Sequence, residues 1–296
     1  MKQAEDRSAP TALVLGKSGK LGSAMMAALA RDFAVVGTTS ADLDARDAEA
    51  VARLVRASAP AVVVNCIAKM GIPACEEEPQ TAFALNTQLP GQLADLSRTL
   101  GFKLVHFSTD SVFPDRPEGD QGVYVETDAA RPLNTYGITK FGGDCHVQAR
   151  ANDYLLVRIS VLFGPSPKGN QFVERMLARA ARGQALSVAH DVIGSPSYSL
   201  DVAGRVAEMI VKGAPAGLHH VANLGRPSLH ELMVAATAAC GLSAEVHAVS
   251  HESFPSVGVK NRRTPIGTVK GPSLRPWREA LAAYCAALDL DRLRQS

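Results

Sequence analysis

The chain has 296 residues, of which 46% are hydrophobic and 20% charged, and its formal net charge is +2. This balance is typical of a globular protein with a sizeable core, and it gives no support for nucleic-acid binding, which usually requires a basic surface. No apolar run approaches the ~20 residues that cross a membrane, and the polar first ten residues are unlike a secretory signal. We therefore expect neither nucleic acid nor membrane among its partners.

The cysteines are odd in number and widely spaced, with no C-x-x-C pair; they are Cys66, Cys75, Cys145, Cys240 and Cys285. Such a pattern does not predict a disulfide framework or a zinc site, and it favours a reducing cytoplasm as the compartment. The histidines also lack the spacing of metal ligands, so no metal site is predicted.

Near the N-terminus, a short apolar run at 12–15 leads into the glycine-rich segment 16–22 and then into a helical pattern at 23–30. A strand, a glycine loop and a helix in this order place a pyrophosphate at the helix N-terminus. The spacing is G-x-x-G-x-x-G rather than the more usual G-x-G-x-x-G. It is the position of the loop between strand and helix that predicts dinucleotide binding.

The next predicted strand, 34–37, ends in Thr38-Thr39-Ser40. An acidic residue at this strand end would bind the ribose hydroxyls of NAD and repel a 2′-phosphate. None is present, and Lys17 adds a positive charge in the preceding loop. The pattern favours NADPH, with NADH still possible.

Strands and helices alternate along the chain, with further strands predicted at 61–66, 104–107 and 155–159 and helices at 47–57, 81–100, 170–182 and 277–288. This alternation predicts an α/β fold, a Rossmann-type doubly wound parallel sheet with a smaller C-terminal α/β substrate lobe. We expect the NAD(P)-binding domain at 1–164 and 195–222, and the substrate-binding lobe at 165–194 and 223–296. The acidic run 76–78 is expected to be surface charge at the start of a helix.

Tyr136 and Lys140 carry the strongest chemical signal. Residues four apart lie on one face of a helix, so both side chains can serve one site. We expect the nearby ammonium to lower the tyrosine pKa from its usual ~10 and so prepare the phenol for proton transfer. Ser108 and Thr109 end the strand 104–107, at the edge where open parallel sheets bind ligands.

These groups suit hydride transfer between a nicotinamide and a carbonyl or alcohol. Tyr136 would supply the proton, and Thr109 or Ser108 would donate a hydrogen bond to the reacting oxygen. Lys140 would tune Tyr136 and bind the nicotinamide ribose, while the cofactor carries the redox chemistry.

Recognisable blocks of sequence cover nearly the whole chain: GKSGKLG (16–22), VVVNCIA (62–68), STDSVFP (108–114), VETDAARPLNTYGITK (125–140), FGPSPKGNQFVERML (163–177), DVIGSPSYSLDVA (191–203) and RPWREAL (275–281). In this order they resemble the dTDP-4-dehydrorhamnose reductase family, within the extended short-chain dehydrogenase/reductases. The resemblance implies a cytoplasmic NAD(P)H-dependent oxidoreductase that reduces the 4-keto group of a deoxysugar nucleotide, and it is compatible with a homodimer.

The resemblance also implies roles for individual positions. Catalysis would fall to Thr109, Tyr136 and Lys140. The cofactor would be bound by Gly16, Lys17, Ser18, Gly19, Lys20, Leu21, Asp42, Leu43, Cys66, Ile67, Ala68, Asn86 and Ser108, together with Tyr136 and Lys140. The substrate would be bound by Lys69, Asp110, Ser111, Val161, Asn170, Arg262 and Arg263.

The sequence departs from the family pattern at the substrate end. Ser111 stands where these reductases usually have Tyr, residues 159–161 read Ile-Ser-Val instead of Thr-Ser-Trp, and residues 69–71 read Lys-Met-Gly instead of Ala-Tyr-Thr. Where the family usually has Arg-Pro-x-Asn-Ser, residues 263–267 read Arg-Thr-Pro-Ile-Gly. These changes predict a wider or differently shaped sugar pocket.

Arg262 and Arg263 are candidates for the substrate diphosphate, because guanidinium groups match phosphate oxygens; the alternative is a solvated basic turn. Two other functions stay open. A sugar-nucleotide epimerase or dehydratase shares the Tyr/Lys pair but consumes no net cofactor. A non-catalytic regulatory subunit, resembling the methionine adenosyltransferase β subunit, would bind NADP and act through a partner.

Overall fold

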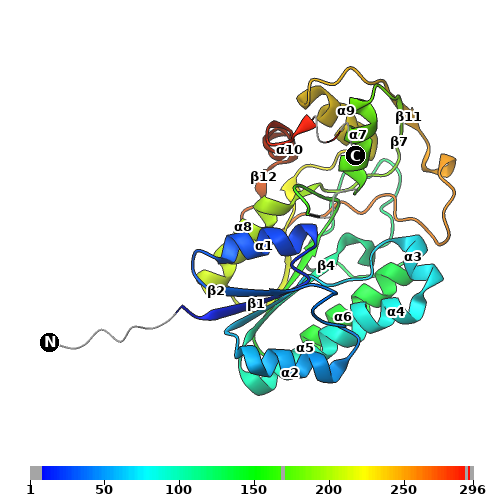
Figure 1. Cartoon of the computed structure of the whole chain (residues 1–296). Helices are drawn as coiled ribbons and strands as arrows, with labels where there is room; N and C mark the ends of the chain where they lie inside the picture. The colour runs from blue at the N-terminus through cyan, green and yellow to red at the C-terminus, as the bar shows by residue number, and fades with distance from the viewer. Residues whose placement is uncertain (1–8, 168–170, 291–292, 294–296) are drawn as a thin grey trace.

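The computed structural model describes residues 9–167, 171–290 and 293 (Figure 1). Its centre is a six-stranded parallel sheet in the order β2-β1-β3-β4-β5-β9. The strands are β1 (Thr11–Leu15), β2 (Ala34–Thr38), β3 (Val62–Asn65), β4 (Lys103–Thr109), β5 (Tyr154–Ile159) and β9 (Gly217–His220). In chain order, β2 is added on one side of β1, and the other four strands are then added one after another on its other side. This order confirms the predicted doubly wound sheet.

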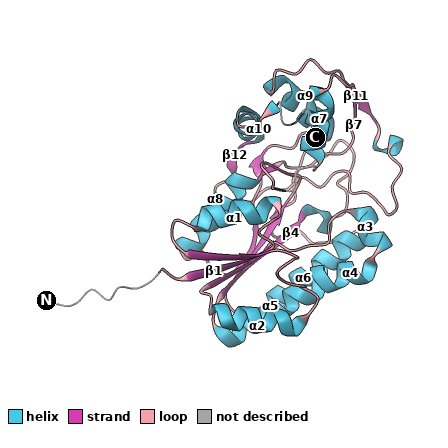
Figure 2. Cartoon of the chain, viewed as in Figure 1, coloured by secondary structure: helices cyan, strands magenta, loops and turns pink. Residues whose placement is uncertain are grey.

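Helices cover both faces of the sheet (Figure 2). One face packs against α1 (Lys20–Leu29) and α8 (Ser199–Val211). The other packs against α2 (Ala48–Ser58), α5 (Leu89–Leu100) and α6 (Thr135–Arg150). Strands covered on both faces read as continuous apolar runs, which explains the valines of β3. None of the helices in the described ranges is long and apolar enough to cross a bilayer.

The predicted helix 81–100 is divided by a wider turn. It consists of α4 (Pro79–Phe83), a π-helical turn η1 (Ala84–Gln88) and α5. Pro90 has no N–H to bond the carbonyl four residues earlier, and a π turn directly before α5 gives its ring room. The helix ends at Gly101, whose φ of 79° is the left-handed conformation that glycine adopts at helix ends.

A second lobe stands over the upper end of the sheet in the view of Figure 1. It contains α7 (Phe172–Ala181), α9 (Leu229–Ala239), α10 (Trp277–Ala286) and the parallel pair β7 (Leu186–Ala189) and β11 (Val246–Val249), which enclose their own apolar cluster. Short connecting elements complete the fold: α3 (Ile72–Glu77), η2 (Asp110–Val112), η3 (His251–Ser253), β6 (Leu162–Phe163), β8 (Ser197–Tyr198), β10 (Asn223–Leu224) and β12 (Leu274–Pro276).

The acidic run 76–78 ends α3 and directly precedes α4, for which Glu78 is the N-cap, so it stands at a helix start as predicted. The Glu76 carboxylate also accepts hydrogen bonds from the Thr135 N–H (2.9 Å) and hydroxyl (2.5 Å). A carboxylate is favoured there because the N-terminus of α6 has unpaired N–H groups and a positive dipole end. Glu77 and Glu78 are exposed, as a surface charge is expected to be, and half-buried Glu76 in addition binds an element far along the chain.

Candidate active site

Helix α6 brings Tyr136 and Lys140 to the C-terminal edge of the sheet. The Asn134 side chain caps the helix by accepting a hydrogen bond of 2.9 Å from the Gly137 N–H. A Cβ at Gly137 would lie only 2.3 Å from the Ser111 carbonyl oxygen, so glycine lets the helix sit directly against the turn after β4. This contact fixes where the first turn of α6 presents its side chains.

Lys140 is buried beside the end of β4. Its Nζ donates a hydrogen bond of 2.6 Å to the Phe107 carbonyl oxygen. Burial lowers the pKa of Lys140 to about 8, and the negative charge of Asp144, one helical turn further on, opposes that shift. The hydrogen bond to Phe107 thus fixes the position of the Lys140 side chain, and its pKa lies close to neutral pH.

The expected lowering of the Tyr136 pKa is not found. Burial raises the pKa of Tyr136, and its hydrogen bond with the Thr109 side chain only partly offsets this. The physical reason is that desolvation disfavours the phenolate while the ammonium is committed to Phe107. A phenol with a raised pKa stays protonated at neutral pH, which suits a proton donor.

A cavity of about 610 Å³ lies at this edge of the sheet. It is lined by many of the residues expected to bind the cofactor, namely Gly16, Ser18, Gly19, Lys20, Leu21, Leu43, Cys66, Ile67, Ala68 and Ser108, and by Tyr136 and Lys140. The glycine loop and the Tyr/Lys pair are more than a hundred residues apart in sequence. The fold brings them to one cavity.

Other predicted cofactor residues do not line this cavity. The Lys17 side chain packs beside Gly37 of β2. The Asp42 carboxylate accepts hydrogen bonds from the N–H and hydroxyl of Thr39 (2.8 and 2.9 Å) and so shapes the turn after β2.

Asn86 also lies behind the cavity wall. It is buried, and its amide holds both the N–H and the carbonyl of Lys69 (2.9 and 3.0 Å) as well as the Thr139 hydroxyl (3.1 Å). Asn86 therefore positions the chain after β3 against helix α6, and its hydrogen-bonding groups are already engaged.

None of the predicted substrate residues that the structure describes is among the residues lining the cavity. Asp110 is held at the start of η2, where it accepts hydrogen bonds from Thr109 (3.0 Å), Ser160 (2.6 Å) and Thr264 (2.9 Å). Burial raises the pKa of Asp110, and those hydrogen bonds oppose the shift. Ser111 donates its N–H to Thr109 at 3.1 Å.

The remaining substrate candidates are engaged with other parts of the chain. Lys69 pairs with Glu78 at 2.5 Å, and the Val161 carbonyl accepts the Ser197 N–H. Arg262 pairs with Asp115 at 3.0 Å, while Arg263 donates to the Arg116 carbonyl at 2.9 Å. Asn170 lies outside the described residues.

The sequence reasoning missed Arg46, which lines the cavity beyond β2. Its guanidinium pairs with both carboxylate oxygens of Asp44, at 2.9 and 2.8 Å. The signal was available: an Arg two residues after an acidic residue, just ahead of a predicted helix. Further lining residues without a prediction are Met70, Thr81, Leu85, Phe107, Ile159, Leu162, Ser166 and Gln171.

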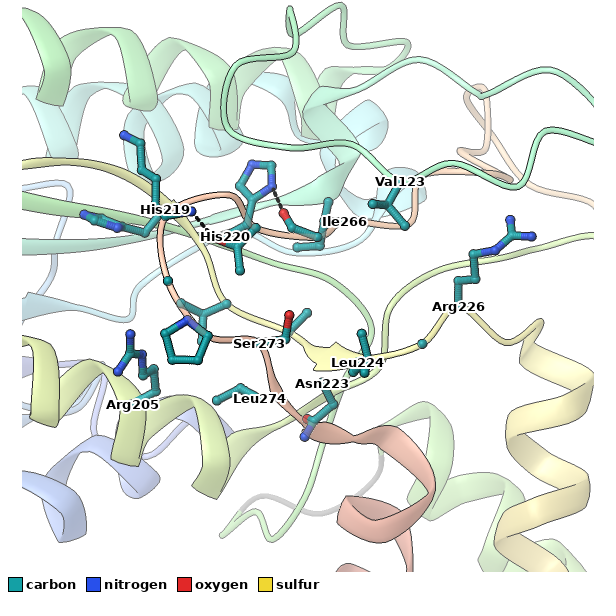
Figure 3. Close-up of a pocket in the computed structure, with 18 of the residues that line it drawn as sticks. Val123, Arg205, His219, His220, Asn223, Leu224, Arg226, Ile266, Ser273 and Leu274 are labelled. Carbon is teal, nitrogen blue, oxygen red and sulfur yellow. Dashed lines mark hydrogen bonds between the residues drawn. The ribbon is translucent and has the colours of Figure 1, made fainter.

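A second cavity, of about 220 Å³, lies beside β9 and β10 and is shown in Figure 3. Its walls are largely apolar and include Ile266 and Leu274. The His220 Nδ1 is hydrogen-bonded to the Gly267 carbonyl (2.9 Å), and burial lowers the pKa of His220 to about 4, so the ring is neutral. None of the predicted site residues within the described part of the chain lines this cavity, so we assign the candidate site to the cavity of about 610 Å³.

Comparison with known proteins identifies relatives over nearly the whole chain. The family described as RmlD substrate binding domain matches residues 11–290. The dTDP-4-dehydrorhamnose reductase of Mycolicibacterium smegmatis is 31% identical, over 93% of this chain and 85% of the relative. The spore coat polysaccharide biosynthesis protein SpsK of Bacillus subtilis is also 31% identical, over 92% and 95%. The dTDP-4-dehydrorhamnose reductase of Bacillus anthracis, solved in complex with NADP, superimposes with a TM-score of 0.88 at 27% identity, covering 94% of this chain and 99% of its own.

Proposed function

This chain belongs to the RmlD substrate binding domain family, and on that premise we propose that it is an NADPH-dependent reductase of a 4-keto deoxysugar nucleotide. The observation that carries the proposal is that Tyr136 and Lys140 line the same cavity as the glycine loop 16–22. A proton donor, a cation and a dinucleotide cradle in one cleft are the parts that carbonyl reduction requires.

The glycine loop fits a dinucleotide. Gly16 has a φ of 84°, a conformation that side chains rarely adopt, and a Cβ at Gly22 would lie 2.1 Å from the Gly16 carbonyl oxygen. The loop can close this tightly only with glycine at both positions. Its turn leads into the N-terminus of α1, whose free N–H groups favour an anion such as a diphosphate.

The end of β2 fits NADPH in particular. Of the two nearby acids only Asp44 lines the cavity, and it is paired with Arg46, whereas the charged Asp42 carboxylate accepts hydrogen bonds from Thr39 and is not among the lining residues. A 2′-phosphate would therefore meet hydroxyls and an arginine rather than an unpaired negative charge. The relative from Bacillus anthracis was solved with NADP, which supports the same cofactor here.

In the proposed reaction, NADPH held by the glycine loop 16–22 would supply the hydride for reduction of the sugar carbonyl carbon. Tyr136 donates its phenolic proton to the carbonyl oxygen, where negative charge develops. The hydrogen bond between Thr109 and Tyr136 orients the phenol. Lys140, which is held at the cavity wall by its hydrogen bond to the Phe107 carbonyl, would bind the nicotinamide ribose.

The test is to incubate the purified protein with NADPH and a panel of 4-keto-6-deoxy sugar nucleotides, starting with dTDP-4-dehydrorhamnose. We expect one NADPH consumed per alcohol formed, followed by absorbance and by product mass. Product formed without net NADPH loss would point instead to an epimerase or dehydratase. NADPH binding without turnover on any sugar would favour the regulatory-subunit alternative.

A Gly22→Ala variant tests the cradle itself. The new Cβ meets backbone atoms of Gly16, which cannot rotate away, so we expect a loss of about 1–3 kcal/mol of stability and an NADPH Kd raised about tenfold or more. Gly204→Ala on α8 is the matched control, because nothing lies within 4 Å of its Cβ and a helical Gly→Ala change should stabilise by about 0.5–1 kcal/mol. Wild-type affinity in Gly22→Ala would contradict the assignment of this loop.

A further inference from the structure

Lys20 makes an unexpected contact for a residue of a diphosphate-binding loop. It is the first residue of α1 and lines the large cavity, yet it is only 2% exposed. Its Nζ lies 2.7 Å from Oε1 of Glu174, which comes from α7 of the second lobe. The Tyr284 hydroxyl of α10 donates to the same oxygen at 2.8 Å. One carboxylate thus joins the glycine loop to two helices of the other lobe.

The positive charge of Lys20 is balanced by the negative charge of Glu174. Burial lowers the pKa of Lys20, while the charge and hydrogen bond of Glu174 oppose the shift. The other carboxylate oxygen of Glu174, Oε2, is buried without a hydrogen-bond partner among the described residues. A diphosphate entering the loop would therefore meet a neutral ion pair in place of a free lysine cation.

We propose that Glu174 is a positioning residue that holds Lys20 and thereby sets the affinity of the loop for the cofactor diphosphate. Tyr284 of α10 fixes the orientation of the Glu174 carboxylate, and the contact of Glu174 with Lys20 ties the loop to the lobe expected to bind the sugar. This inference rests on the proposed function in taking NADPH as the ligand of the loop.

The proposal predicts that replacing Lys20 and replacing Glu174 change the NADPH Kd in opposite directions. Lys20→Met leaves a buried carboxylate unpaired beside the diphosphate, and we expect the NADPH Kd to rise about tenfold or more. Glu174→Gln frees the ammonium to face the diphosphate, and we expect the Kd to fall about threefold or more. The double variant removes both charges and should return to within about twofold of the wild type, because the pair is again neutral.

The measurement is NADPH binding without sugar, by fluorescence titration, on variants whose thermal melts show them to be folded. Lys20→Arg, which keeps the charge, should rescue Lys20→Met. If both single variants weaken binding, the cluster is only structural and the proposal is overturned. If Glu174→Gln alone does not fold, Lys20→Met is compared with the double variant. A lower NADPH Kd in the double variant supports the proposal, because the two differ only in the unpaired carboxylate, and an equal Kd overturns it.

These outcomes are separate from the fate of the proposed function. A wild-type protein that binds no NADPH would contradict the proposed function. If the wild type binds NADPH but the effects of Lys20→Met and Glu174→Gln on the NADPH Kd simply add, only the role of Glu174 is contradicted.

Discussion

A Tyr136→Phe variant is expected to bind NADPH with wild-type affinity and to lose turnover by about 10²–10⁴-fold, the usual contribution of a positioned general acid. The change removes a single oxygen atom and keeps the ring that lines the cavity. Burial raises the pKa of Tyr136, so the wild-type phenol enters the reaction protonated, and no other phenol lines this cavity among the described residues. The developing oxyanion in the variant would lack its proton.

The measurement is kcat and KM for the best sugar nucleotide, with NADPH Kd determined separately. Tyr154→Phe is the matched control, because Tyr154 starts β5 at the opposite end of that strand from Ile159 and does not line the cavity. It should retain full turnover. An unchanged kcat in Tyr136→Phe would contradict the assigned role, whereas a loss seen only in KM would point to substrate binding instead of proton transfer.

Removing either partner of the Asp144–Arg158 pair is expected to cost about 3–5 kcal/mol of stability, because the remaining charge is left buried without compensation. The two side chains are 0% and 3% exposed, and their closest atoms are 3.0 Å apart. Arg158 lies within the sheet on β5, and its guanidinium also stacks over the Phe113 ring at 5.0 Å. Burial raises the pKa of Asp144, and the Arg158 charge opposes that shift, so each group depends on the other.

Chemical denaturation of Asp144→Asn and Arg158→Met, each compared with the wild type, measures the loss. The surface pair Lys212–Glu208 supplies the control: Lys212 is 72% exposed, and Lys212→Ala should change stability by less than about 1 kcal/mol. The double variant Asp144→Asn/Arg158→Met should cost less than either single change, because neither charge of the pair is then left without its partner. Single variants as stable as Lys212→Ala would show that the pair is not needed for folding.

The fold class and the family were correctly predicted from the sequence, because both depend on local patterns. Continuous apolar runs such as 62–64 indicate strands covered on two faces, and the structure places them in a parallel sheet. Tyr136 and Lys140 could be assigned to one face of one helix because the helical repeat alone fixes that geometry. The roles of individual site residues remain predictions, to be tested by the variants above.

The environment of those residues could not be predicted in the same way. A Lys four residues from a Tyr was expected to lower its pKa, but in the folded protein the ammonium is bonded to Phe107 and burial acts in the opposite direction. Glu76 was predicted only as a surface charge, and the fold gives it a partner at the N-terminus of α6. In both cases the deciding partner belongs to another element.

The sequence by itself thus determined the order of strands and helices, the glycine loop and the pairing of Tyr136 with Lys140 on one helix face, since these follow from backbone periodicity and short spacings. Only the tertiary structure decided which charges meet. Lys20 joins Glu174 across 154 residues of sequence, and Arg262 joins Asp115 across 147. Burial and electrostatic partnership depend on how distant elements pack, so no local pattern could reveal that the lysine of the glycine loop is held by the second lobe.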